Sequence, residues 1–406
     1  MNTPKIRFKG FKDDWEQRKL GEVAEYRNGK AHENEIDEDG EYIVVNSKFV
    51  STNAEIRKFS NAQNEPLYEN EIAFVLSDVP NGRAIARTFL VDKSGKYTLN
   101  QRIAGITPHE DTDPYYLHIR MNRNAYFLKF DDGNKQTNLS IKDVLNYEDM
   151  YPSYKEQHKI GLYFRQLDNL ITLHQCKCDE TKELKKFMLQ KMFPKNGEKN
   201  PEIRFEGFTD DWEQRKFGEL AEYKKGPFGS AITKDMFVPK NDESVKVYEQ
   251  QNAINKDWSL ERYFLPKEYA LTKLKSFEVH GGDIIVSCAG TIGEIYEIPD
   301  NADSGVINQA LMRVRVNECI VDKKMFIIVF SNMIDEFTRT HGNGSAIKNI
   351  PPFADLKPME VLIPSIDEQK KLREHFSSLD NLITLHQRKC EKLKELKKYM
   401  LQNMFV

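Results

Sequence analysis

Amide and guanidinium side chains recur beside glycines in two parts of the chain, and their chemistry suits the reading of nucleobases. The run Ser287-Cys-Ala-Gly-Thr-Ile-Gly293 is followed by Asn308-Gln309, and the run Val79-Pro-Asn-Gly-Arg83 is followed by Asn100-Gln-Arg102. Asn and Gln amides can pair bidentately with adenine, and Arg with guanine, in the major groove of DNA. The same Asn-Gln pairs also suit turns and strand ends, so both interpretations stay open for each residue.

The full set of predicted DNA contacts shares a polar or basic side chain in a loop or at the end of an expected strand. Lysines in this set could meet phosphates, although solvated lysines are more common. In the first half the predicted residues are Lys30, Lys48, Asn81, Arg83, Asn100, Gln101, Arg102, Asn134, Lys135 and Gln136. In the second half they are Lys225, Ser230, Lys234, Gln250, Gln251, Asn252, Thr291, Asn308, Gln309, Asn343 and Lys348.

Catalytic motifs are missing from the sequence. It contains no Gly-x-x-x-x-Gly-Lys-Ser/Thr phosphate loop, no dinucleotide fingerprint and no His-Glu-x-x-His. Asn349-Ile-Pro-Pro352 has the wrong order for the Asn-Pro-Pro-Tyr motif of adenine methyltransferases. The five cysteines have no zinc-like spacing and are expected to be free thiols in a reducing compartment. We therefore expect no catalytic residue, no metal site and no cofactor in this chain.

Length and charge limit the class of protein. A chain of 406 residues is too long for one ordinary core, so two or more domains are expected. The 60 basic and 63 acidic residues leave a net charge of −3, which argues against indiscriminate polyanion binding but not against a local basic face. No apolar run reaches the length of a membrane span, and the first residues lack the apolar core of a signal peptide. The expected location is the cytoplasm.

Two internal repeats set the domain plan. Residues 4–26 return at 201–223 with 18 of 23 positions identical, a shift of 197 residues. Residues 151–194 return without a gap at 363–406 with 27 of 44 positions identical, a shift of 212. The interiors between these repeats show no comparable similarity. The sequence therefore predicts a pseudo-dimer within one chain, built from two half-molecules with shared ends and different middles.

The interiors combine strand and helix patterns. Residues 20–26 and 217–223 have helical spacing before a glycine, which predicts a short helix followed by a loop. Short β-type runs bounded by Asn, Gly and Pro are expected at 41–45, 71–76, 83–91 and 102–106, and at 245–248, 283–287, 293–298 and 310–316. Helices are expected at 114–128 and 322–334. Each half is therefore predicted to be an α+β domain closed by a helix.

The closing helices carry the clearest pattern. Ser153-x-x-Glu156 and Ser365-x-x-Glu368 have the spacing of a capping box, and a heptad seam follows each. The nearest partner for either seam is the other copy. The predicted interface residues are Leu167, Ile171, His174, Leu184, Met188, Leu379, Ile383, His386, Leu393 and Met400. The predicted globular domains are 1–151 and 195–363, and the predicted helices are 152–194 and 364–406.

These features resemble the specificity subunits of type I restriction-modification systems. The resemblance is carried by the Ser-x-x-Glu-Gln helix starts, the run Gly282-Asp-Ile-Ile-Val-Ser-Cys-Ala-Gly-Thr-Ile-Gly293 and Ile307-Asn-Gln-Ala310, and it covers nearly the whole chain. It implies two dissimilar target-recognition domains, each reading half of a split DNA target, separated by two long helices that form an antiparallel coiled-coil spacer. The first interior departs from the pattern, because Asp78–Arg83 stands where the second has Ala289–Gly293.

The same resemblance implies partners for the chain. They are two adenine-N6 methyltransferase subunits that bind S-adenosylmethionine, and restriction subunits that use ATP and Mg²⁺. Catalysis would belong to those partners and not to this chain. A stand-alone DNA-binding regulator and a coiled-coil scaffold remain as alternatives from the residues alone.

Overall fold

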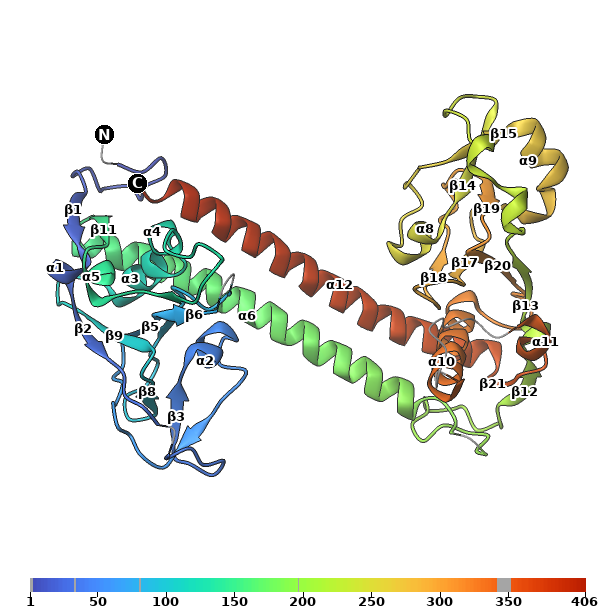
Figure 1. The fold of residues 1–406 in the computed structure, drawn as a ribbon. Coiled ribbons are helices and arrows are strands. Elements are labelled where there is room, and N and C mark those ends of the chain that lie inside the picture. Colours follow the sequence, from blue (N-terminus) through green and yellow to red (C-terminus); the bar gives the residue numbers. More distant parts are fainter. Residues whose placement is uncertain (1–2, 33, 80–81, 196, 342–351) are drawn as a thin grey trace. The chain divides into compact units, whose positions relative to one another are not determined.

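The computed structural model describes residues 3–32, 34–79, 82–195, 197–341 and 352–406 (Figure 1). The chain forms two compact units. Unit 1 comprises Met1–Cys178 and Leu385–Val406, and unit 2 comprises Asp179–Thr384. Each unit therefore contains one of the dissimilar interiors together with a part of both repeated helices.

Unit 1 contains two main sheets. The four-stranded sheet has the order β2 (Ala24–Asn28), β9 (Ile103–Pro108), β5 (Ile72–Val75) and β7 (Thr88–Leu90). The three-stranded sheet has the order β4 (Phe59–Ser60), β3 (Tyr42–Val45) and β8 (Tyr97–Leu99), with β3 parallel to β8. Shorter pairs are β1 (Glu16–Lys19) with β11 (Glu148–Tyr151) and β6 (Ser77–Asp78) with β10 (Thr137–Asn138). The helices of this interior are α1 (Leu20–Val23), α2 (Ser47–Ser51), α3 (Pro114–Met121), α4 (Ala125–Leu128) and α5 (Ile141–Leu145).

Unit 2 repeats this topology with different residues. One sheet has the order β13 (Ala221–Lys225), β20 (Leu311–Val316), β17 (Ile284–Ser287) and β18 (Ile295–Glu297). The other has the order β15 (Phe264–Pro266), β14 (Ser244–Tyr248), β19 (Gly305–Ile307) and β16 (Glu278–Val279), with β14 parallel to β19. β12 (Glu213–Lys216) pairs with β21 (Glu360–Ile363). The helices are α7 (Phe217–Leu220), α8 (Gln250–Ile254), α9 (Lys267–Lys273), α10 (Lys323–His341) and α11 (Phe353–Leu356). The 3₁₀ turns are η1 (Gly229–Ala231), η2 (Lys234–Met236) and η3 (Lys275–Phe277).

Several sequence predictions need correction at their boundaries. The segment after α1 is the strand β2 and not a loop, because Ala24 is extended and the chain from there pairs with β9. The predicted strand 83–91 is a turn followed by the short β7. The predicted helix 114–128 divides into α3 and α4, since Asn122 and Asn124 cap the two pieces.

The repeated helices are α6 (Tyr154–Lys191) and α12 (Ile366–Asn403), of 38 residues each. In unit 1 they pack antiparallel: Lys397 Nζ lies 2.6 Å from Asp168 Oδ1, and His174 Nδ1 lies 3.0 Å from His386 Nδ1. In unit 2 Lys185 Nζ lies 2.6 Å from Asp380 Oδ1. These two ion pairs are equivalent under the 212-residue shift. The predicted α+β fold with an antiparallel helix pair is confirmed.

The seam residues divide between the units. Leu167 is buried in the core of unit 1, where Leu393 and Met400 pack against it, and Leu379 is buried in unit 2 with Met188. Ile171 also lies in the seam, since its carbonyl faces the Cys390 thiol at 4.0 Å. Ile383 is partly buried.

One predicted interface residue does not join this seam. Leu184 is 44% exposed. The next residue, Lys185, faces α12 instead and forms the ion pair with Asp380.

The predicted capping boxes have a different role. The hydroxyl of Ser365 accepts from the Glu368 N–H at 3.4 Å, but the carboxylate of Glu368 accepts two hydrogen bonds from Arg204. The buried carboxylate of Glu156 accepts two from Arg7 in the same way. Each glutamate therefore ties the start of its helix to the other repeated segment, in a buried pair whose loss would leave an uncompensated charge.

The tryptophans of the first repeat anchor it in the core of each unit. Trp15 is buried and packs edge-on against Phe405 with ring centroids 6.3 Å apart, and Trp212 packs against Phe193 at 5.7 Å. Backbone hydrogen bonds of 2.8 Å accompany them, from Ile6 to Asn403 in unit 1 and from Ile203 to Lys191 in unit 2. The same contacts between repeated segments therefore flank each interior.

Candidate nucleic-acid interface

The carboxyl ends of four strands meet at one edge of unit 2. β13 and β17 run in the same direction because both pair antiparallel with β20, and β14 runs parallel to β19. The ends of these strands are joined by backbone hydrogen bonds. Asn308 N donates to Tyr248 O at 3.0 Å, and Gly226 N donates to Leu311 O at 2.8 Å. This edge, called here the loop edge, gathers the turns that follow all four strands.

Close backbone approach explains the glycines at this edge. A Cβ on Gly226 would lie 1.8 Å from the carbonyl oxygen of Asn308, and one on Gly229 would lie 2.4 Å from the amide oxygen of Gln309. At position 226 only glycine fits, because the contact is with backbone, whereas at position 229 the Gln309 side chain would have to move. The Gly226-Pro-Phe-Gly229 turn is therefore pressed against Asn308-Gln309, and it presents Phe228 with 90% of its surface exposed.

A small cavity of about 160 Å³ opens beside this turn. Its lining includes the aromatic residues Phe228, Phe237 and Tyr263 and the polar residues Glu249, Asn308 and Gln309. Phe237 and Tyr263 stack with ring centroids 4.1 Å apart. Burial raises the pKa of Glu249 above its usual value. Aromatic faces beside amide donors and acceptors are chemistry suited to nucleobases.

Most of the residues predicted in the second half lie at the loop edge. Gln309, Lys225 and Thr291 are exposed there, and Asn308 is partly buried. Ser230 in η1, Lys234 in η2 and Gln251 in α8 are exposed on the adjoining turns. The amide of Gln250 is partly used to hold the loop after β17, because it donates to the carbonyls of Ala289 and Thr291.

One residue of this set has a structural role. Asn252 is only 2% exposed, and its amide nitrogen donates to the carbonyls of Asp257 and Leu260. Its amide oxygen accepts from the Glu249 N–H. Its prediction as a DNA contact is wrong because the whole amide is used inside the protein. Asn343 and Lys348 lie outside the described residues.

Unit 1 builds the same edge from β2, β3, β5 and β8. Lys30 N donates to Leu99 O at 3.0 Å, and Asn100 N donates to Val45 O at 3.1 Å. Leu76 N donates to Arg102 O at 3.1 Å, so Arg102 lies at the end of β5. Gln101, Arg102 and Lys48 are exposed on the turns of this edge.

Other residues predicted in the first half are partly engaged. Lys30 Nζ lies 3.0 Å from Glu65, which compensates its charge. The Gln136 amide donates to the Ser77 hydroxyl at 2.8 Å and so joins the β10 segment to the end of β5. Asn134 and Lys135 are exposed. Their backbone N–H groups donate to the Asp132 carboxylate, and these hydrogen bonds stabilise a turn. Asn81 lies outside the described residues.

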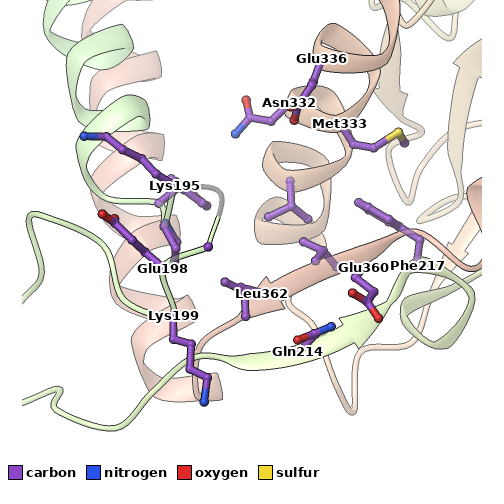
Figure 2. A pocket seen from close by; sticks show the side chains of 15 residues that line it. Lys195, Glu198, Lys199, Gln214, Phe217, Asn332, Met333, Glu336, Glu360 and Leu362 are labelled. Carbon is purple, nitrogen blue, oxygen red and sulfur yellow. The ribbon is translucent and has the colours of Figure 1, made fainter. Parts of the chain in front are cut away.

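A larger hollow of about 530 Å³ lies elsewhere in unit 2, between residues 193–199, α10 and the β12–β21 pair. Figure 2 shows Lys195, Glu198 and Lys199 on one wall and Asn332, Met333 and Glu336 on another. Its charges are of both signs, and none of the predicted DNA contacts lines it. We assign no ligand to it.

The part of the chain that the structure describes contains no group of three or more His, Cys, Asp or Glu side chains arranged to hold a metal ion. None of the five cysteines forms a disulfide, and Cys176 and Cys319 are exposed. Among the described helices, none is long and apolar enough to span a membrane.

Comparison with known proteins identifies relatives over the full length of the chain. A family model described as the type I restriction modification DNA specificity domain matches twice, at residues 12–183 and 209–395. The type I restriction enzyme MjaVIII specificity subunit of Methanocaldococcus jannaschii is 23% identical, covering 95% of this chain and 91% of that protein. The putative type I restriction enzyme MjaX specificity subunit of the same organism is 21% identical, covering 98% and 94%.

Solved structures share the fold. The crystal structure of a type I restriction-modification system S subunit from M. genitalium superposes with a TM-score of 0.64 at 14% identity, covering 100% of this chain and 99% of that one. A chain from a structure of a type I R-M system, described in terms of complex assembly and conformational transition, gives a TM-score of 0.54 at 14% identity, covering 97% and 98%.

Proposed function

Since the chain belongs to the type I restriction modification DNA specificity family, we propose that it is the DNA-specificity subunit of a type I restriction-modification complex. Each unit reads one half of a bipartite target through its loop edge. The observation that carries this assignment is that both units have the same topology and the same convergence of strand ends, while the side chains there differ. Equal geometry with unequal chemistry at base-reading positions gives an asymmetric target.

The proposal places catalysis in partner subunits. Two adenine-N6 methyltransferase subunits would bind S-adenosylmethionine and modify the target, and restriction subunits would use ATP and Mg²⁺. The chain would act as a non-catalytic component in the cytoplasm, where the DNA lies. The lack of recognisable catalytic motifs in the sequence is consistent with this division of labour.

Exposed apolar rows on the two long helices support docking of protein partners. At equivalent positions, each helix carries a row of four large apolar side chains that are between 41% and 55% exposed and are spaced by three, eleven and three residues. This spacing is a second heptad row, distinct from the seam between the helices. Solvent-exposed rows of this kind mark surfaces that pack against further helices. The residues are Leu170, Leu173, Leu184 and Phe187 in α6 and Leu382, Leu385, Leu396 and Tyr399 in α12.

Exchange of the second interior tests the function directly. Replacing residues 224–359 by the corresponding interior of another family member keeps β12, β21 and both helices in place. We expect only one half-site of the target to change, because the loop edge of unit 1 is untouched. Sequencing of N6-methyladenine in cells that carry the complete system measures both half-sites.

The reciprocal exchange, of residues 29–147, is the matched control and should change only the other half-site. A change of both half-sites in either exchange would contradict separate reading by the two units. Methylation without any sequence preference would contradict the specificity role itself.

A further inference from the structure

Three arginines of unit 1 surround one backbone turn. The Nε of Arg87 donates to the carbonyl of Arg83 at 2.6 Å, and the Nη1 of Arg123 donates to the carbonyl of Ile85 at 3.2 Å. The backbone N–H of Arg123 donates to the carbonyl of Ala86 at 2.7 Å. The turn therefore holds Arg83, Arg87 and Arg123 together, and we call these three residues the arginine cluster.

The arginine cluster lies at the loop edge of unit 1. Val75, the last residue of β5, donates to the carbonyl of Arg87 at 2.9 Å and accepts from Ala86 N–H at 3.0 Å. The next residue, Leu76, is bonded to the carbonyl of Arg102, one of the predicted DNA contacts. The cluster thus lies beside a predicted DNA contact, although Arg87 and Arg123 themselves were not predicted.

Within the described part of the chain, the positive charge of the arginine cluster is not compensated. Among the residues that the structure describes, no carboxylate forms an ion pair with any of the three guanidinium groups. Asp78, in the same loop, has its carboxylate occupied by the N–H groups of Val79 at 2.8 Å and of Ala84 at 2.6 Å. Burial, and then the positive charges of Arg123 and Arg83, lower the pKa of Arg87.

The backbone around the cluster is strained. Ala86 and Arg123 both have φ of +56°, the left-handed region that costs free energy for any residue with a Cβ. The two strained residues are hydrogen-bonded to each other. A fold that needed only stability would gain nothing from strain combined with three adjacent like charges. Such a combination is typical of a binding site for an anion.

Unit 2 lacks an equivalent among its described residues. The loop after β17, which corresponds to the loop after β5, carries Glu294, and its carboxylate pairs with Lys256 at 2.8 Å. The charge there is neutralised within the protein. The arginine cluster therefore distinguishes unit 1 from unit 2 by its capacity to bind an anion.

We propose that the arginine cluster binds phosphate groups of the DNA backbone beside the half-site read by unit 1. Guanidinium groups donate bidentately to phosphate oxygens, and most of the donors on these three side chains have no acceptor among the described residues. This assignment rests on the proposed function and adds to it. Arg83, predicted as a base contact, takes the role of a phosphate contact.

Salt dependence of DNA binding tests the assignment. The protein, with its methyltransferase partners, is prepared unchanged and with Arg87→Gln plus Arg123→Gln, and the Kd for a mixed-sequence duplex is measured over a series of KCl concentrations. We expect binding to weaken about tenfold or more. The slope of log K against log salt should become shallower by about 0.9 for each phosphate that the variant no longer neutralises, or roughly two in all. Discrimination between sequences should stay the same.

Lys93→Gln is the matched control, because Lys93 is an exposed cation in the turn after β7, at the opposite end of the sheet. It should leave the slope unchanged. If the double variant does not fold, Arg83→Gln alone replaces it, because Arg83 is exposed. This single variant should reduce the slope by about 0.9. Thermal unfolding confirms that each variant is folded.

Three results would overturn the assignment. They are a slope that does not change in folded variants, a loss of sequence discrimination in place of the slope change, and equally strong binding of inorganic phosphate by the cluster without DNA. The last would identify a free-anion site. If the unchanged protein had no preference for any sequence, the specificity proposal would fail, whereas the slope comparison would still decide the role of the cluster.

Discussion

His118, in α3, couples the fold of unit 1 to protonation. Its Nδ1 is inaccessible to solvent and has no hydrogen-bond partner among the described residues. Burial lowers the pKa of His118 from 6.5 to about 4, and the positive charge of Lys397 adds to the effect, whereas Asp168 opposes it. The folded protein therefore holds this imidazole neutral at pH values where an unfolded chain begins to protonate it.

A loss of stability on acidification follows. Between about pH 6.5 and 4 the unfolded chain binds a proton at His118 that the folded chain does not, so the free energy of unfolding falls as the pH falls through this window. The contribution is at most ~3 kcal/mol. His118→Gln should lose less stability between pH 7 and pH 5 than the unchanged protein, as measured by urea unfolding. His109→Gln serves as the control, and equal pH dependence in all three proteins would refute the role of His118.

At the level of single side chains, the sequence predicts some residues of the candidate site and misses others. Glycine spacing and side-chain type were enough to select Asn308 and Gln309, which lie at the loop edge. They could not show that the amide of Asn252 is used internally, because its partners at Asp257 and Leu260 depend on how the loop after α8 folds. They also missed Phe228 and Arg123. The exposure of Phe228 and the strained backbone of Arg123 are properties of the folded turns.

At the level of elements, α6 and α12 follow closely from the sequence, because a heptad period over many turns has few alternative structures. The strands of the interiors were harder to delimit, since β7 and β18 have only three residues each. The helix starts were identified correctly, but the glutamate carboxylates of the predicted capping boxes pair with arginines of the other repeated segment. A capping box is a local pattern, whereas Arg7 and Glu156 are 149 positions apart in sequence.

The exposed apolar row of α6 leads to a prediction on assembly. Leu170→Glu with Leu173→Glu should leave the unfolding temperature of the chain nearly unchanged, because both side chains are exposed. The same double substitution should prevent stable association with the proposed methyltransferase partners, since it would put charge into the proposed apolar contact. Co-purification and analytical ultracentrifugation measure the association.

Asn169→Glu with Thr172→Glu is the matched control for this prediction. These polar residues are exposed on α6 at positions outside both heptad rows, and they should not affect assembly. If the leucine variant assembled normally, the row would not be a docking surface.

For the whole molecule, the repeats predicted the plan of two half-molecules, and both units have that plan. The shared topology of the interiors was beyond reach of the sequence, because their residues show no comparable similarity and topology is set by burial rather than by identity. The contacts that frame each interior come from repeated residues: Trp15 with Phe405, and Trp212 with Phe193. An interior exchanged from another family member would therefore be held by the same contacts between repeated residues.

The identical peptides Leu167–Gln175 and Leu379–Gln387 make a shorter chain possible. Joining Gln175 to Arg388 removes 212 residues, leaves 194 and keeps the heptad register. All contacts of unit 1 between residues 1–175 and 388–406 could then form between two copies of the short chain, including the ion pair of Asp168 with Lys397. We expect a homodimer in sedimentation equilibrium, and Phe405→Asp should weaken it. A monomer that stays folded would contradict this expectation.

The same junction has a genetic meaning. Because the two peptides are identical, a deletion in the gene that joined their coding segments in frame would remove an interior together with a helix and leave the peptide intact. A homodimer of the shortened chain would contain two copies of a single reader, so its target would become a palindrome. The repeat that packs the two helices together would thus also allow a shortened protein with a different target.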